Sequence, residues 1–185
     1  MNDLFKNINI SIIDTISIEA ELSGKEVYLV GGFVRDLILN RRNKDIDVMV
    51  VGNGIDFAKL ISNKLNKKLQ IFKNFGTAML KTENYDIEFV GARKESYSKD
   101  SRNPVVEQGT LVEDLSRRDF TINSLAISLN KKNYGEIIDL FSGRADIDKK
   151  IIRTPLDPKI TFHDDPLRMM SCLLYTSDAA DDMQC

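Results

Sequence analysis

Two aspartates one residue apart are the first residues in this chain whose type and spacing could do chemistry. Asp45 and Asp47 lie in a run of strand-forming residues, D-I-D-V-M-V. Because side chains alternate between the two faces of a strand, both carboxylates should share one face while Ile46 lies on the other. A later apolar run repeats the pattern with Asp86 and Glu88. We expect Glu88, which is nearer the centre of its strand, to join the aspartate pair.

Three carboxylates on adjacent strands would repel one another unless cations neutralise them. The chain has one histidine, and both of its cysteines lie after residue 171, so oxygen atoms must supply the ligands. Oxygen ligands favour Mg²⁺ or Mn²⁺. In a two-metal site one ion activates an attacking hydroxyl and the other stabilises the leaving pyrophosphate. The three acids therefore predict metal-dependent nucleotidyl transfer.

A glycine pair upstream of the aspartates could bind the phosphates of such a substrate. Gly31 and Gly32 follow the apolar run V-Y-L-V and precede a short helical pattern. Without a Cβ in the way, backbone N–H groups at the start of that helix can approach an anion. Arg35 lies about one helical turn further on, so its guanidinium can return to the same phosphate. We expect Asp36 to orient Arg35 or to cap locally.

A second group of polar residues lies in the segment R-R-D-F-T-I-N at 117–123. Arginine is suited to bidentate phosphate binding. Asn123 could bind a ribose hydroxyl, or it could be an asparagine of a helix interior that the backbone satisfies. We count Arg118, Asp119 and Asn123 as candidate nucleotide-binding residues.

The sequence pattern around these residues predicts an α+β domain. Its mixed, largely antiparallel sheet would be flanked by helices. Apolar spacing predicts helices over 4–24, 33–39, 57–65 and 111–129, and strands over 27–30, 46–51, 69–72, 77–81, 85–90 and 137–140. Short links at 74–76 and 83–84 imply antiparallel pairing. The polar segment 93–109 is expected to be a long flexible loop. Asp164, Asp165 and Pro166 indicate a further helix start.

The composition is that of an ordinary globular chain that can bury one good core and part of a second lobe, with 185 residues, 42% apolar and 29% charged. The formal charge of −2 creates no general basic field, so a nucleic acid would meet local clusters such as Arg41, Arg42 and Lys44. No apolar stretch approaches the ~20 residues of a membrane span. Asp3 and Asp14 occupy the region where a signal peptide would be apolar. We expect a cytoplasmic protein without a membrane partner.

Four motifs occur in order: V-G-G-F-V-R-D at 30–36, D-I-D at 45–47, R-R-D-F-T-I-N at 117–123 and D-D-P-L-R at 164–168. Together they resemble the family of tRNA nucleotidyltransferases and bacterial poly(A) polymerases, in the DNA-polymerase-β-like nucleotidyltransferase superfamily. The resemblance covers residues 27–168. It implies a nucleotidyltransferase head domain over residues 1–150 and the start of a helical neck over 151–170.

The resemblance also implies what the residues do. Asp45 and Asp47 would hold the metal, and triphosphate contacts would come from Gly32, Arg35, Arg118 and Arg168. The implied reaction builds CCA onto the 3′ end of tRNA from CTP and ATP without a nucleic-acid template. Poly(A) polymerases and enzymes that add only CC or only the final A share these motifs, so they remain alternatives.

Two departures from the family pattern bear on that expectation. The family places another arginine three residues after Arg168, where this chain has Ser171. Residues 171–185 lack an amphipathic helical stripe, and we interpret them as a tail that is not native. A base-reading neck and a tRNA-binding body have no counterpart here, so an inactive nucleotide- or RNA-binding fragment is a second hypothesis. A purely structural α+β domain would have to explain four ordered motifs by chance.

Overall fold

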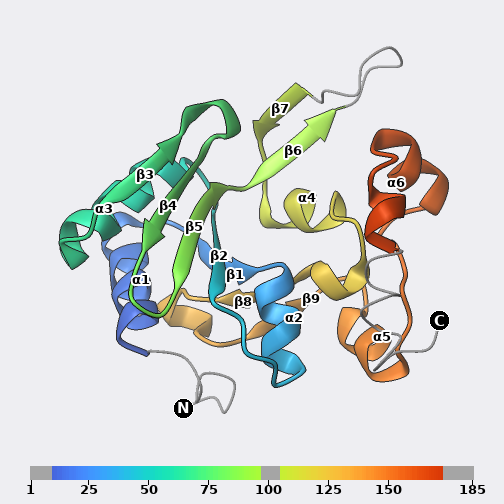
Figure 1. Ribbon diagram of the computed structural model, residues 1–185, viewed down its shortest axis with the longest axis horizontal. Coiled ribbons are helices and arrows are strands. Elements are labelled where there is room, and N and C mark those ends of the chain that lie inside the picture. The colour runs from blue at the N-terminus through green and yellow to red at the C-terminus, as the bar shows by residue number, and fades with distance from the viewer. Residues whose placement is uncertain (1–9, 97–104, 173–185) are drawn as a thin grey trace. The chain divides into compact units, whose positions relative to one another are not determined.

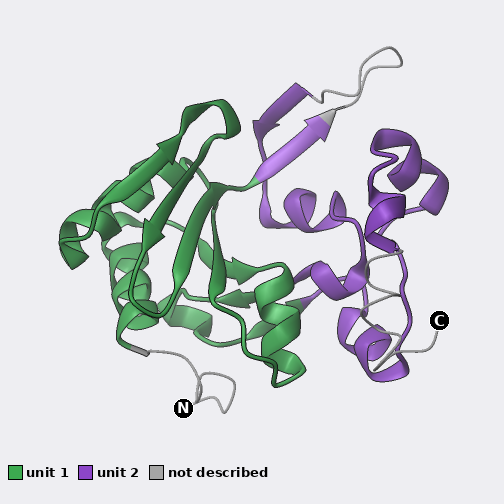
Figure 2. Cartoon of the chain, viewed as in Figure 1, with its two compact units in different colours: residues 1–92, 126–138 green, residues 93–125, 139–185 purple. Residues whose placement is uncertain are grey.

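The computed structural model describes residues 10–96 and 105–172 of the chain. The chain divides into two compact units, which we call unit 1 (residues 1–92 and 126–138) and unit 2 (residues 93–125 and 139–185; Figure 2). The chain leaves unit 1 after residue 92 and returns to it once. The predicted division at residues 150 and 170 follows neither unit and stays a prediction about domains.

Unit 1 is built on a seven-stranded sheet with the order β3-β4-β5-β2-β1-β8-β9 (Figure 1). The strands are β1 (Val27–Val30), β2 (Asp45–Val50), β3 (Leu69–Phe72), β4 (Thr77–Lys81), β5 (Asp86–Gly91), β8 (Leu125–Ser128) and β9 (Ile137–Asp139). β2 and β5 run parallel, whereas β1 pairs antiparallel with β2 and β8, and β4 pairs antiparallel with β3 and β5. This mixed, mostly antiparallel sheet with helices confirms the predicted α+β fold.

The helices of unit 1 bury their apolar sides against this sheet. They are α1 (Ile10–Ser23), α2 (Gly32–Ile38) and α3 (Gly54–Leu65), with short 3₁₀ turns η2 (Lys73–Phe75) and η4 (Lys131–Asn133). α2 contacts β1 and β2, and α3 contacts β4 and β5. The rings of Phe57 and Phe89 have centroids 6.1 Å apart in a tilted arrangement. A Cβ on Gly54 would lie 2.5 Å from the carbonyl carbon of Val90, so glycine is what lets α3 start this close to β5.

Unit 2 begins with an antiparallel hairpin and continues in short helices. Its elements are β6 (Arg93–Ser96), β7 (Val105–Gln108), α4 (Leu111–Ser116), the 3₁₀ turn η3 (Thr121–Asn123), α5 (Gly143–Lys149) and α6 (Pro158–Asp164). Thr110 and Glu113 form a reciprocal capping box that starts α4. Asp157 caps α6, with Pro158 in its first turn.

Most predicted elements occur where the sequence placed them. β1, β3 and β4 have the predicted bounds, and α2, α3, β2, β5 and β9 differ by a few residues at their ends. α1 confirms the later part of the predicted first helix, while residues 4–9 lie outside the described residues. Asp165 confirms the predicted helix start, because its side chain accepts the N–H of Leu167 at 3.0 Å and residues 168–172 are helical.

Two predictions of secondary structure were wrong. Ile122, Leu125, Ala126 and Leu129 have helical spacing, yet Leu125–Ser128 is the strand β8, whose four residues are all buried. A strand buried on both faces carries a continuous apolar run, which periodicity does not separate from a buried helix. The predicted loop over 93–109 forms β6 and β7 at its two ends, and residues 97–104 lie outside the described residues.

α5 and α6, each seven residues long, were not predicted. Asp157 followed by Pro158 is a start signal for α6 that could have been found. Residues 173–185, which hold nearly all of the predicted tail, lie outside the described residues. In the described ranges, no helix combines the length and apolarity that crossing a bilayer demands.

Candidate active site

The predicted acidic residues lie side by side on two parallel strands of unit 1. In the register of β2 and β5, Asp45 is opposite Asp86 and Asp47 is opposite Glu88. Residues opposite each other on paired strands project to the same face, so these carboxylates form two neighbouring rows on one face. Asp45 is exposed, whereas Asp47 and Glu88 are half-buried.

The surroundings of Glu88 and Asp86 differ, although both lie on β5. The Lys81 ammonium lies 3.3 Å from a carboxylate oxygen of Asp86 in an ion pair between β4 and β5. Asp86 therefore has a local cation, which agrees with the sequence-based preference for Glu88 as the third acid.

The side chains in the described part of the chain form no group of three or more His, Cys, Asp or Glu that is arranged to hold a metal ion. The register thus makes Asp47 and Glu88 neighbours. The three predicted acids are not arranged as a complete set of metal ligands in the described residues. What the two strands do offer is carboxylate oxygen, which is the donor that Mg²⁺ and Mn²⁺ take in proteins.

The glycine pair lies at the turn between β1 and α2, as predicted. Gly31 has φ 73° and ψ −150°, a backbone conformation that favours glycine. A Cβ on Gly32 would lie 3.4 Å from the nearest guanidinium nitrogen of Arg35, so the arginine folds back over this glycine. Arg35 thus lies close enough to the glycine turn to meet a phosphate bound there, and that phosphate contact stays a prediction.

Asp36 holds Arg35 in that position. The Nε and Nη2 groups of Arg35 both donate to Oδ1 of Asp36, at 2.9 and 2.8 Å, and the amide of Asn43 donates to Oδ2 at 2.7 Å. Asp36 is 9% exposed, so these bonds are shielded from water. The prediction that Asp36 orients Arg35 is confirmed.

In unit 2 a buried carboxylate organises the two arginines of the R-R-D segment. Asp114 of α4 is fully buried. Its Oδ1 accepts from Arg117 at 2.8 Å, and its Oδ2 accepts from Arg118 at 2.9 Å. Burial alone would raise the pKa of Asp114, but the guanidinium groups of Arg118 and Arg117 outweigh it and hold that pKa below its usual value.

Asp119 and Asn123 form a local contact just after α4. Oδ1 of Asp119 accepts the N–H of Phe120 at 2.8 Å and the side-chain amide of Asn123 at 3.0 Å. Asn123 lies in a 3₁₀ turn and is 7% exposed, so the alternative of a helix-interior asparagine was wrong. Its predicted ribose contact stays a prediction.

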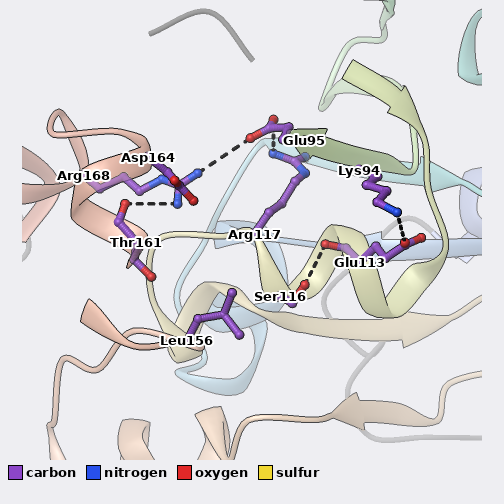
Figure 3. Close-up of a pocket in the computed structure, with 9 residues that line it drawn as sticks. All are labelled: Lys94, Glu95, Glu113, Ser116, Arg117, Leu156, Thr161, Asp164 and Arg168. Atoms are coloured by element: carbon purple, nitrogen blue, oxygen red, sulfur yellow. Dashed lines mark hydrogen bonds and ion pairs between the residues drawn. The ribbon is translucent and has the colours of Figure 1, made fainter. Parts of the chain in front are cut away.

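Arg168 lines a hollow of about 220 Å³ in unit 2, together with residues of β6, α4 and α6 (Figure 3). One of its guanidinium nitrogens lies 3.7 Å from Oε2 of Glu95, and Arg117 donates to Oε1 of the same Glu95 at 2.8 Å. Figure 3 shows Glu95 between the two arginines.

Sequence reasoning missed Asp114 and Glu95. Asp114 precedes Arg117 and Arg118 by three and four residues, the helical spacing of an ion pair, so it could have been found. Glu95 meets Arg117 from another element, 22 residues away, and no local pattern marks that contact.

The predicted site residues therefore fall into two sets. Unit 1 carries Asp45, Asp47, Glu88, Gly31, Gly32 and Arg35, and unit 2 carries Arg118, Asp119, Asn123 and Arg168. The first set comes from one sheet and its adjoining helix, and the second comes from short elements joined by ion pairs.

The amino-acid sequence was compared with models of known protein families. Residues 27–153 match the family model described as the poly A polymerase head domain. The chain belongs to that family. The matched region contains Asp45, Asp47, Glu88 and the glycine turn, whereas Arg168 lies beyond it.

The relatives of this chain include A-adding tRNA nucleotidyltransferases and CCA-adding enzymes. The chain is 43% identical over 148 residues to the A-adding tRNA nucleotidyltransferase of Aquifex aeolicus, a match covering 80% of this chain and 18% of that protein. It is 38% identical over 159 residues to the CCA-adding enzyme of Lactobacillus helveticus, covering 85% of this chain and 38% of that protein. The chain thus spans less than half the length of these relatives.

The fold is also that of a solved family member. A tRNA nucleotidyltransferase complexed with a primer tRNA and an incoming ATP analog superimposes with a TM-score of 0.75 at 39% identity. The match covers 85% of this chain and 43% of that one. The similarity in sequence and structure identifies the architecture as that of a nucleotidyltransferase head domain.

Proposed function

We propose that the protein transfers nucleotides from nucleoside triphosphates to the 3′ end of tRNA without a template and releases pyrophosphate. The observation that carries this proposal is the pairing of β2 with β5, which sets Asp47 beside Glu88 and Asp45 in the next row of the same face. The family membership of the chain supports the same chemistry.

Asp45 and Asp47 are the residues that we propose would hold the divalent cations, Mg²⁺ or Mn²⁺, with Glu88 as the third acid. Their oxygen atoms fit these hard cations. When bound, the metal would lower the pKa of the attacking 3′ hydroxyl and stabilise charge on the leaving pyrophosphate.

Binding of the triphosphate is the task that we assign to the glycine turn and the arginines. Arg35, held over Gly32 by Asp36, presents a fixed guanidinium beside a backbone that has no Cβ to exclude an anion. Arg118 and Arg168 would add positive charge from unit 2, and Asp119 and Asn123 would contact the nucleoside. Catalysis would consist mainly of positioning and charge neutralisation.

We propose CTP and ATP as substrates, with CCA addition as the product. Addition of A alone is the second candidate, because the Aquifex relative is an A-adding enzyme. Poly(A) synthesis is a third, since the matching family model is described as a poly A polymerase head. A role in tRNA processing would place the protein in the cytoplasm.

The alternative of a different class is a nucleotide- or RNA-binding fragment without activity. The chain spans 38% of the Lactobacillus relative, so that relative has additional sequence that could supply base selection or tRNA binding. This alternative predicts nucleotide binding without transfer.

Thermal unfolding with ATP tests the proposed site in the chain itself. At a concentration of ATP about a hundredfold above its Kd, binding should raise the Tm by roughly 5–10 °C in the presence of Mg²⁺. A chelator should abolish most of this shift, because without the metal the carboxylates would repel the triphosphate and ATP would bind more weakly.

Asp47→Asn should remove the metal-dependent part of the shift while leaving the Tm without ligand nearly unchanged. The matched control is Asp56→Asn, which changes an exposed carboxylate of α3 that pairs with the exposed Lys59. A full Mg²⁺-dependent shift in Asp47→Asn would refute the metal role of Asp47.

A further inference from the structure

Glu95 occupies a central place in unit 2 that the proposed roles leave unexplained. Its side chain is only 9% exposed, although it lies in a strand of four polar residues. Arg117 donates to Oε1 at 2.8 Å, and a guanidinium nitrogen of Arg168 lies 3.7 Å from Oε2 (Figure 3). One buried carboxylate thus faces two arginines that are far apart in the sequence.

These contacts extend into a chain of alternating charges. The order is Arg168, Glu95, Arg117, Asp114 and Arg118, with three guanidinium groups and two carboxylates. The carboxylates are the least exposed members, at 9% and 0%, while the arginines are 12–21% exposed. Guanidinium groups repel one another, so the buried acids are what allows three of them to gather.

The contacts of Arg168 are long, whereas those of Arg117 and Arg118 are short. Arg168 reaches Glu95 at 3.7 Å, Asp165 at 3.8 Å and the carbonyl of Thr161 at 3.4 Å. Asp165 is 40% exposed, so Glu95 is the better shielded of its two acidic partners. Glu95 is therefore the partner that does most to set the direction in which the guanidinium group of Arg168 points.

We propose that Glu95 is a positioning residue for nucleotide binding, which holds Arg168 in line with Arg117 and, through Asp114, with Arg118. Glu95 itself does not touch the nucleotide. It fixes the orientation of the Arg168 guanidinium group, so that the guanidinium groups are already oriented when the triphosphate binds. The inference rests on the proposed function, because it assumes that Arg118 and Arg168 bind a nucleoside triphosphate.

Titration calorimetry of the chain with ATP and Mg²⁺ tests this role. Glu95→Gln keeps the shape and an acceptor for Arg117 but removes the charge that attracts Arg168. We expect it to weaken ATP binding about tenfold or more, since charge-assisted hydrogen bonds are roughly twice as strong as neutral ones. The matched control is Glu107→Gln, which changes an exposed acid on the partner strand β7 and should bind as the wild type does.

Combination with Arg168→Ala separates positioning from general support of the fold. If Glu95 acts through Arg168, Glu95→Gln should add little to the loss already caused by Arg168→Ala. If Glu95 only supports the fold, its substitution should weaken binding by the same factor in both backgrounds, and this additive result would overturn the inference.

Other outcomes are equally decisive. If the Glu95→Gln variant binds ATP as tightly as the wild type, the inference is refuted and the proposed function still stands. If the wild type does not bind ATP, both are refuted. If Glu95→Gln fails to fold, Glu95→Asp replaces it, because the shorter acid keeps a charge near Arg117 and withdraws from Arg168. Unchanged ATP affinity in Glu95→Asp would then contradict the proposal.

Discussion

At the scale of single residues, the site depends on acids that direct arginines. Asp36, Asp114 and Glu95 are each nearly buried, and each accepts from a guanidinium at 2.8 Å or slightly more. A buried carboxylate without a partner would be costly, so each arginine also stabilises the acid that orients it. The guanidinium groups that we propose as phosphate ligands are thereby oriented before a ligand arrives.

Arg35→Ala should mainly weaken triphosphate binding. Loss of a guanidinium that lies over Gly32 removes charge-assisted contacts, so the Kd for ATP should rise by roughly tenfold to a hundredfold. Equilibrium dialysis with ATP and Mg²⁺ measures the change. Arg41→Ala, at an exposed arginine after α2, is the control, and a normal affinity in Arg35→Ala would overturn the assignment.

The acids on β2 and β5 were predictable from the sequence because strand periodicity alone places Asp45 and Asp47 on one face. The register that sets Asp47 beside Glu88 could not be predicted, since it depends on pairing between strands that are about 40 residues apart. For the same reason the bond from Arg35 to its neighbour Asp36 was predicted, whereas the bond from Arg117 to Glu95 was missed.

At the scale of elements, α4 is held by charged contacts at both of its ends. Its capping box fixes its first turn, and Asp114 on its buried side receives Arg117, Arg118 and the backbone N–H of Arg93 at 3.1 Å. The helix, the R-R-D segment and the start of β6 are therefore joined at one carboxylate.

The stability of the fold should depend on pH through Asp114. Its pKa is lowered in the folded state, so its stabilising contribution is complete above the unfolded value near 3.8 and is lost as the pH falls through the lower folded value. Asp114→Asn should lower the free energy of unfolding at pH 7, and its difference from wild type should shrink as the pH falls below about 4. Urea unfolding at several pH values measures both.

The control for that series is Asp148→Asn, an exposed acid in α5 whose replacement should cost little at any pH. A destabilisation by Asp114→Asn that stays constant down to pH 2 would contradict the ion-pair explanation. It would indicate that packing, and not charge, determines the contribution of Asp114.

Secondary structure was predictable wherever an element shows its own periodicity. β1 and β4 were found in full because turn residues bound short apolar runs. β8 was assigned to a helix because its burial on both faces hides the alternation that marks a strand. β6 was missed because all four of its residues are polar. β7 was missed because its only apolar residues are two adjacent valines, which do not alternate with polar residues, and all four of its residues are exposed.

At the scale of the whole molecule, the predicted machinery is divided between two compact units. The acids and the glycine turn belong to unit 1, and the network of three arginines belongs to unit 2 (Figure 2). The sequence indicated the family through four ordered motifs, but it did not show that residues 126–138 return to unit 1 and complete its sheet.

Incorporation of labelled nucleotide into tRNA tests the proposed nucleotidyl transfer at Asp45 and Asp47. The protein would be incubated with Mg²⁺, labelled CTP or ATP, and tRNA that ends before CC, before A, or complete. We predict that C and A are added to the incomplete tRNAs and that Asp47→Asn reduces incorporation by at least about a hundredfold. Addition of A alone would favour the A-adding assignment, while incorporation that Asp47→Asn leaves intact would contradict the account.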